Sequence, residues 1–79
     1  MTNITIYSTP TCGYCDVAKD WLSARNIPYV EKNVAADLEA RREMVEKSQQ
    51  LGVPVFDING SIMVGYNEAK MRELIGITE

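Results

Sequence analysis

The apolar positions along this chain change their spacing several times, and each change predicts a new element of secondary structure. Alternating, β-branched stretches predict strands at residues 3–8, 27–34, 53–58 and 61–65. Apolar residues at helical spacing predict helices at residues 13–25, 37–51 and 67–76. The expected order is therefore strand, helix, strand, helix, strand, strand, helix.

Several single residues support these boundaries. Asp37 and Asn67 are favourable N-caps for the second and third helices, and Gly76 is a favourable stop for the third. Asn59-Gly60 is the residue pair that tight hairpins prefer. The residues expected to face the core are Val17, Ala18, Trp21 and Leu22 in the first helix, Leu38, Val45 and Leu51 in the second, and Met71, Leu74 and Ile75 in the third.

The connections predict the topology of the sheet. Helical connections between the first three strands indicate that these strands are parallel, and the hairpin makes the fourth antiparallel. Right-handed crossovers then give the strand order 2-1-3-4, with the first and second helices on opposite faces. We therefore expect an α/β fold with a four-stranded mixed sheet and helices on both faces. Its winding reverses at the carboxyl end of the first strand, where sites form in open α/β sheets.

The composition narrows the class of protein. The chain has 79 residues, which predicts a single domain over residues 1–79. The net charge is −3 and the sequence has no basic patch, so we expect no nucleic-acid or membrane partner. The sequence has no signal-peptide pattern and no membrane-length apolar run. We therefore expect a cytoplasmic monomer.

The two cysteines lie at the predicted junction of the first strand and the first helix. If Cys12 is the N-cap, the N–H groups of Tyr14 and Cys15 lack intrahelical partners and can donate to a Cys12 thiolate. These donors and the helix dipole lower the pKa of Cys12 below the free value of ~8.5. Asp16 opposes this, but solvent should screen its charge. Cys12 is thus the expected nucleophile, and Cys15, one turn further in, the expected resolving thiol.

The cysteine pair also allows other interpretations. A zinc site within one chain is excluded because the sequence has no His and only two Cys, so no metal ligand is predicted. A structural disulfide is disfavoured, because so short a loop constrains the unfolded chain little and because the expected compartment keeps thiols reduced. Two small buried side chains, or a zinc ion or iron–sulfur cluster shared between two subunits, are the remaining alternatives. The Cys-x-x-Cys pair in a strand–helix–strand pattern favours a redox function.

Two further segments allow a structural and a functional interpretation. Pro54 can begin a strand, or it can follow a cis peptide bond that exposes the Val53 backbone to a substrate strand beside Cys12. Gly65 and Asn67 can form a turn and a helix cap, or a site for a carboxylate at a helix N-terminus. Tyr14 and Tyr66 could both face such a groove.

Three segments resemble the glutaredoxin family along nearly the whole chain. They are "IYSTPTCGYC", "GVPVF" and "VGYNEAK". The resemblance implies a thioredoxin fold, a thiol–disulfide oxidoreductase activity, and a cis Val53-Pro54 pair. It also implies that residues 65–68 help to hold the γ-glutamyl end of glutathione. The candidate binding residues are Thr11, Tyr14, Val53, Pro54, Gly65, Tyr66 and Asn67.

The chain also departs from the family pattern. It has Gly13 where a proline is common and Thr9 where many members have a lysine. Val64 replaces the first of two glycines, and Asn67 and Glu68 replace two aspartates. We expect no bound cofactor, disulfide-containing proteins as substrates, and glutathione as reductant. The alternative is a redoxin that thioredoxin reductase reduces and that donates electrons to ribonucleotide reductase.

Overall fold

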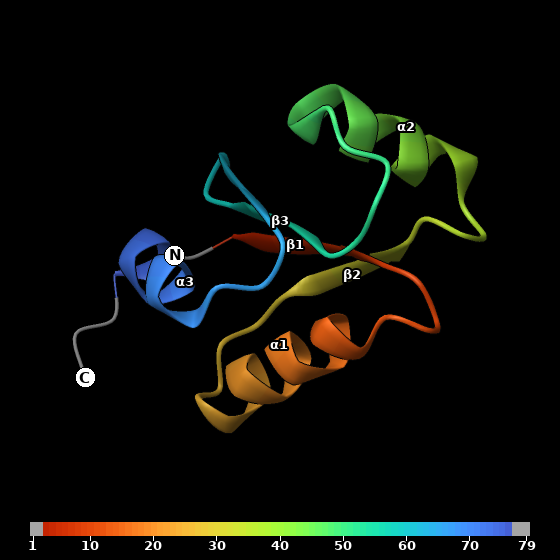
Figure 1. The fold of residues 1–79 in the computed structure, drawn as a ribbon. Coiled ribbons are helices and arrows are strands. Elements are labelled where there is room, and N and C mark those ends of the chain that lie inside the picture. The colour runs from red at the N-terminus through yellow and green to blue at the C-terminus, as the bar shows by residue number, and fades with distance from the viewer. Residues whose placement is uncertain (1–2, 77–79) are drawn as a thin grey trace.

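The structure is a computed structural model of the chain that describes residues 3–76. Its elements follow the predicted order (Figure 1): β1 Ile4–Ser8, α1 Gly13–Ala24, β2 Val30–Asn33, α2 Leu38–Ser48, β3 Val55–Ile58, β4 Ser61–Val64 and α3 Glu68–Ile75. β2 and β3 begin later than predicted, and α2 ends earlier, where Gln49 adopts a left-handed conformation with φ 58°.

The sheet has the predicted order β2-β1-β3-β4, with β2 parallel to β1 and β4 antiparallel to β3. The prediction that the first three strands are all parallel is wrong, because β3 runs antiparallel to β1. The register explains why. Asn33 at the end of β2 pairs with Ser8, and Val55 at the start of β3 pairs with Tyr7. The chain thus leaves β2 and enters β3 at the same end of the sheet, beside the carboxyl end of β1. Because α2 does not carry the chain back to the other end, β3 runs in the opposite direction.

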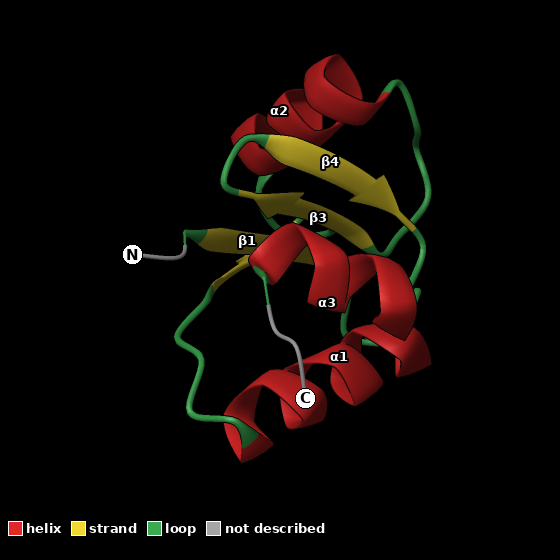
Figure 2. Cartoon of the chain, turned by 90° about the vertical axis from the view of Figure 1, so that its left-hand side faces the viewer, coloured by secondary structure: helices red, strands yellow, loops and turns green. Residues whose placement is uncertain are grey.

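Helices cover both faces of the sheet, as predicted. Figure 2 shows α1 and α3 on one side of the strands and α2 on the other. The core accordingly has two clusters. The first joins the sheet to α1 and α3, and the second joins it to α2 through Tyr7, Val34, Ala40, Met44 and Val55. This two-sided packing holds the end of β1, where the cysteine loop begins, between the layers.

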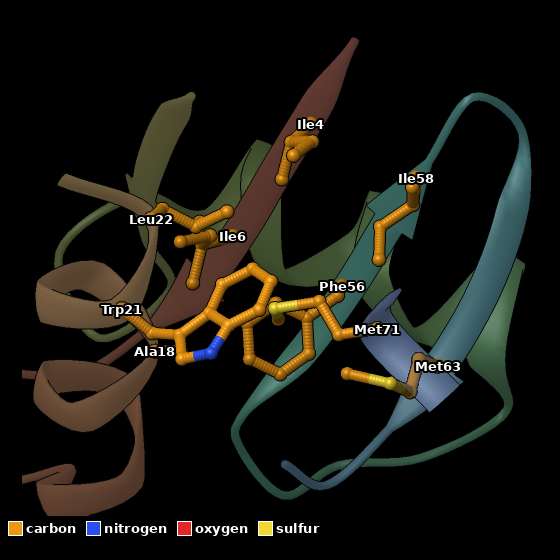
Figure 3. Packing of buried hydrophobic residues seen from close by; sticks show 9 residues of the cluster. All are labelled: Ile4, Ile6, Ala18, Trp21, Leu22, Phe56, Ile58, Met63 and Met71. Atoms are coloured by element: carbon orange, nitrogen blue, oxygen red, sulfur yellow. The ribbon is translucent and has the colours of Figure 1, made fainter. Parts of the chain in front are cut away.

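The first cluster is built around large side chains from three elements. Figure 3 shows Trp21 reaching from α1 toward Phe56 on β3 and Met71 on α3. The prediction that Ala18, Trp21, Leu22 and Met71 face the core is confirmed. Burial of such apolar side chains is the main stabilising contribution to a domain of this size.

The predicted inward faces were partly wrong. Val17, Leu38 and Leu51 have exposed fractions of 49%, 74% and 69%. In α2 the buried residues are Ala40 and Met44, which lie four apart and share one helix face. Leu38 opens the first turn of α2, and Leu51 lies beyond its end, so neither is on that face.

The predicted caps and turns are present. Asp37 Oδ1 accepts from Glu39 N and Ala40 N at 3.0 and 3.2 Å. Asn67 Oδ1 accepts from Lys70 N at 3.1 Å, and Gly76 ends α3 with φ 89°. Asn59 and Gly60 have φ values of 53° and 92°, which fits the hairpin turn that requires two positive values.

Candidate active site

Cys12 is the N-cap of α1, as predicted. Its Sγ accepts a hydrogen bond from Cys15 N at 3.1 Å, and its own N–H donates to Thr9 O at 3.2 Å. The tight turn at residues 9–12 therefore presents the sulfur to the open end of the helix. A thiolate at this position receives the backbone donor and lies at the positive end of the helix dipole.

Cys15 lies behind Cys12 and is bonded to it in a disulfide, with 5.3 Å between the Cα atoms. The exposed fractions are 8% for Cys12 and 1% for Cys15. Cys15 Sγ is also 4.0 Å from Tyr7 O. When the disulfide is reduced, a Cys15 thiol can donate to this carbonyl, whereas Cys12 receives a donor. This geometry fits the expected roles of Cys12 as nucleophile and Cys15 as resolving thiol, which stay predictions.

The residues that flank Cys12 on the surface include a large aromatic. Tyr14 has an exposed fraction of 67%, and Thr11 and Gly13 are exposed as well. Tyr14 and Val17, three residues apart, form exposed apolar surface on the first turns of α1. Such surface is suited to contact with a substrate, although the binding roles of Thr11 and Tyr14 stay predictions.

The Val53-Pro54 peptide bond is cis, which the sequence had left open. Pro54 is buried and directly precedes Val55, the partner of Tyr7. It therefore lies at the same edge of the sheet as the loop that carries Cys12. The side chain of Val53 is partly buried against the second core cluster.

Gly65 lies against this proline. Gly65 N donates to Pro54 O at 2.9 Å, and Gly65 has a φ of 78°, which favours glycine. Tyr66 packs against the first cluster, with 6.4 Å between the centroids of its ring and that of Phe56. Burial, followed by the nearby charge of Glu68, raises the pKa of Tyr66. Asn67 caps α3. The structure thus joins Pro54 and Gly65 directly, while ligand contacts of Tyr66 and Asn67 stay predictions.

A polar cavity beside the cysteine loop was not foreseen from the sequence. It has a volume of about 290 Å³ and is lined by Ser8, Thr9, Pro10, Asp16, Lys19, Glu31 and Asn33. A larger cavity of about 500 Å³ lies along α2, away from the cysteine loop. The smaller cavity arises because β2 places Glu31 and Asn33 beside β1 and α1, and no local pattern in one sequence shows that proximity.

The described residues give two further findings about other kinds of site. Within residues 3–76, no cluster of three or more Cys, Asp or Glu side chains is arranged to hold a metal ion. None of the helices in this part of the chain has the length and apolar character needed to cross a membrane.

The strand order, the cysteine pair at the start of α1 and the cis-proline before β3 together define a thioredoxin-fold protein with a dithiol pair. Comparison with solved structures agrees. The crystal structure of the thioredoxin-like protein BC3987 superposes with a TM-score of 0.84 and is 28% identical, covering 90% of this chain and 97% of its own.

The sequence model of the Glutaredoxin family matches residues 4–63. A glutaredoxin-like 8.6 kDa protein in the rubredoxin operon of Clostridium pasteurianum is 50% identical over 72 residues, which are 91% of this chain and 96% of that protein. Glutaredoxin 3 of Escherichia coli K12 is 31% identical over 68 residues, which are 86% and 82% of the two chains. The chain therefore belongs to the glutaredoxin family, whose members generally act on disulfides.

Proposed function

We propose that this protein reduces disulfide bonds in other proteins by dithiol exchange, with Cys12 as nucleophile and Cys15 as resolving thiol. The observation that carries the proposal is the geometry at the start of α1. Cys12 Sγ accepts the Cys15 N–H at 3.1 Å, and the Cys15 sulfur is almost completely buried behind it. A Cys12 thiolate would be stabilised by this donor, and Cys15, at 1% exposed against 8% for Cys12, could be reached from Cys12 but hardly from solvent.

The proposed reaction has two exchanges. In the first, the Cys12 thiolate attacks one sulfur of the substrate disulfide, a mixed disulfide forms, and the other substrate sulfur leaves as a thiolate that takes a proton. In the second, Cys15 loses its proton and attacks Cys12 Sγ, which releases the second substrate thiol. The substrate gains two electrons and two protons, and the protein ends as the Cys12–Cys15 disulfide seen in the structure.

Return to the dithiol requires two electrons from a reductant, and we propose glutathione. The choice of glutathione is supported by the hydrogen-bonded pair Pro54 and Gly65, which lies at the same end of the sheet as the loop that carries Cys12. Backbone groups there, with Thr11, Tyr14, Val53, Tyr66 and Asn67, would hold the peptide part of glutathione. Reduction by thioredoxin reductase, with ribonucleotide reductase as an electron acceptor, is the alternative. The cytoplasmic location and the monomeric state stay predictions.

A comparison of reductants tests this proposal. Oxidised protein is mixed with NADPH and a disulfide-bonded protein as acceptor. One arm contains glutathione and glutathione reductase, and the other contains thioredoxin reductase. NADPH consumption is followed in both arms. We expect turnover in the glutathione arm and none with Cys12→Ser. Turnover only with thioredoxin reductase would overturn the choice of glutathione. Failure of chemically reduced protein to cleave any disulfide would overturn dithiol exchange itself.

A further inference from the structure

The polar cavity beside the cysteine loop lies where it can affect which substrates react with Cys12. Thr9 lines this cavity, and Thr9 O accepts the Cys12 N–H at 3.2 Å. The cavity therefore adjoins the turn that presents the nucleophile. A substrate bound to Cys12 through a disulfide has neighbouring residues within reach of this turn, because consecutive Cα atoms are only about 3.8 Å apart. The cavity is thus positioned to receive a side chain that flanks the substrate cysteine.

The charges that line the cavity do not balance. Lys19 Nζ lies 3.3 Å from Asp16 Oδ1 and 2.9 Å from Glu31 Oε2, so one ammonium group faces two carboxylates. The lining residues therefore have a net charge of −1. The hydrogen bonds from Lys19 and Ser8 lower the pKa of Glu31, so Glu31 is ionised at neutral pH.

The carboxylates of Asp16 and Glu31 are also exposed enough to accept further hydrogen bonds from a ligand. The side chain of Asp16 has an exposed fraction of 70% and that of Glu31 one of 37%. The buried Ser8 Oγ donates to Glu31 Oε2 at 2.7 Å, which fixes the orientation of this carboxylate. Asn33 also lines the cavity, but its Oδ1 already accepts from Ala35 N and Ala36 N at 2.9 and 3.3 Å, so the carboxylates supply the acceptors. Several acceptors around a net negative charge suit the planar donors of a guanidinium group or the compact donors of an ammonium group.

We propose that this cavity is a specificity site, which selects protein disulfides that carry an arginine or lysine next to the reacting cysteine. The inference rests on the proposed exchange at Cys12 and names its substrate class. Lys19 Nζ occupies the position between the two carboxylates, so a basic side chain would place its charge against their exposed oxygen atoms. An acidic side chain would meet the net negative charge of the lining and would be disfavoured. The cavity does not include Pro54 or Gly65, so it can be occupied separately from a ligand at that segment.

Peptide disulfides that differ at one position test the proposal. Three peptides carry the same cysteine, disulfide-linked to a thiol reporter group, and have Arg, Gln or Glu next to it. Each is mixed with reduced protein in excess, and the rate constant for reporter release is measured. We expect the Arg peptide to react about threefold faster than the Glu peptide, since a charge pair near a protein surface changes an energy only modestly. The ratio should shrink at high salt because of screening.

Charge variants distinguish an effect of the cavity on the rate ratio from the general attraction of any cation to the Cys12 thiolate. Glu31→Gln keeps an acceptor for Ser8 and Lys19 but makes the lining neutral, so the Arg-to-Glu rate ratio should fall toward one. Lys19→Gln leaves two carboxylates and should raise the ratio. Glu73→Gln makes the same charge change as Glu31→Gln, on an exposed residue of α3 outside the cavity, and should leave the ratio unchanged.

The outcomes distinguish the inference from the proposed function. Equal rates for all three peptides, or a ratio that responds to Glu73→Gln as strongly as to Glu31→Gln, would overturn the specificity site while dithiol exchange stands. Failure to release the reporter from any peptide would overturn dithiol exchange, and the inference with it. If Glu31→Gln fails to fold, an unchanged ratio in Lys19→Gln is sufficient to reject the site.

Discussion

Three neighbours affect the reactivity of Cys12: the N–H groups of Cys15 and Gly13, and the Asp16 carboxylate. The backbone donor Cys15 N is 3.1 Å from Cys12 Sγ, whereas the Asp16 carboxylate is 70% exposed and paired with Lys19. The donor therefore outweighs the carboxylate, and the pKa of Cys12 should lie below the free value of ~8.5. Gly13 adds an N–H at the helix start that a proline would remove.

Asp16→Asn should lower the pKa of Cys12 only slightly, because Lys19 and solvent already weaken the effect of this charge. The measurement is thiolate absorbance against pH in the Cys15→Ser background, in which only Cys12 titrates. Asp20→Asn, an exposed change of the same kind further along α1, is the matched control. A pKa of Cys12 at or above ~8.5 in the background variant would contradict the N-cap geometry.

Thr9→Lys should lower the pKa of Cys12 and tighten glutathione binding, since it places a cation beside the loop that carries the nucleophile. Thr9→Gln, which is long but neutral, controls for the added bulk. Glutathione affinity is measured as the equilibrium constant of the mixed disulfide with Cys15→Ser. Equal effects of the lysine and the glutamine would show that charge at this position does not act on the site.

Element α2 owes its start to one side chain. Asp37→Ala removes the acceptor for Glu39 N and Ala40 N and should lower the free energy of unfolding by about 1 kcal/mol. Asp37→Asn keeps a capping oxygen and should cost far less. Urea denaturation measures both. Equal losses in the two variants would show that the negative charge, rather than the cap, stabilises α2.

The sequence predicted which elements form and how they begin more reliably than which faces they bury. Caps such as Asp37 and the turn at Asn59-Gly60 depend on local hydrogen bonds and φ values, so single residues reveal them. The buried face of α2 carries Ala40, which is too small to stand out in a hydrophobic pattern, while Leu38 is exposed at its first turn. The direction of β3 depends on the edge at which the chain re-enters the sheet, and helix length alone does not determine it.

The candidate site also has local features that the sequence predicted and contacts between elements that it did not. The Cys12 cap is a local feature of one strand–helix junction, and the sequence predicted it. The contact between Cys15 Sγ and Tyr7 O, and the ion pair of Lys19 with Glu31, join different elements. They exist only after β1, α1 and β2 have packed together, so no spacing along the chain indicates them.

At the scale of the whole molecule, ion pairs link the layers and make stability depend on pH. Lys19 binds Glu31 between α1 and β2, and Lys32 binds Glu43 at 2.8 Å between β2 and α2. The hydrogen bonds from these lysines lower the pKa of Glu31 and Glu43 below the ordinary value of 4.5. Each contribution is therefore fully present above pH 4.5 and is lost as the pH falls through the lowered value.

Unfolding measured at about pH 7 and about pH 3 should show this dependence. Both glutamates are more than a third exposed on their side chains, at 37% and 35%, so each contributes less than about 1 kcal/mol after screening. Glu31→Gln and Glu43→Gln should each reduce the loss of stability between the two pH values, and Glu73→Gln should not. An unchanged loss in both variants would show that these pairs do not contribute.

Trapping of the covalent intermediate tests whether Cys12 attacks the substrate and Cys15 resolves the mixed disulfide. Reduced Cys15→Ser and Cys12→Ser variants are mixed with a disulfide-bonded peptide, and the intact mass of each is measured. We expect a stable mixed disulfide on Cys12 in Cys15→Ser, no adduct in Cys12→Ser, and release of both peptide thiols by the unmodified protein. An adduct on Cys15 in Cys12→Ser, with Cys15→Ser left unmodified, would contradict these roles.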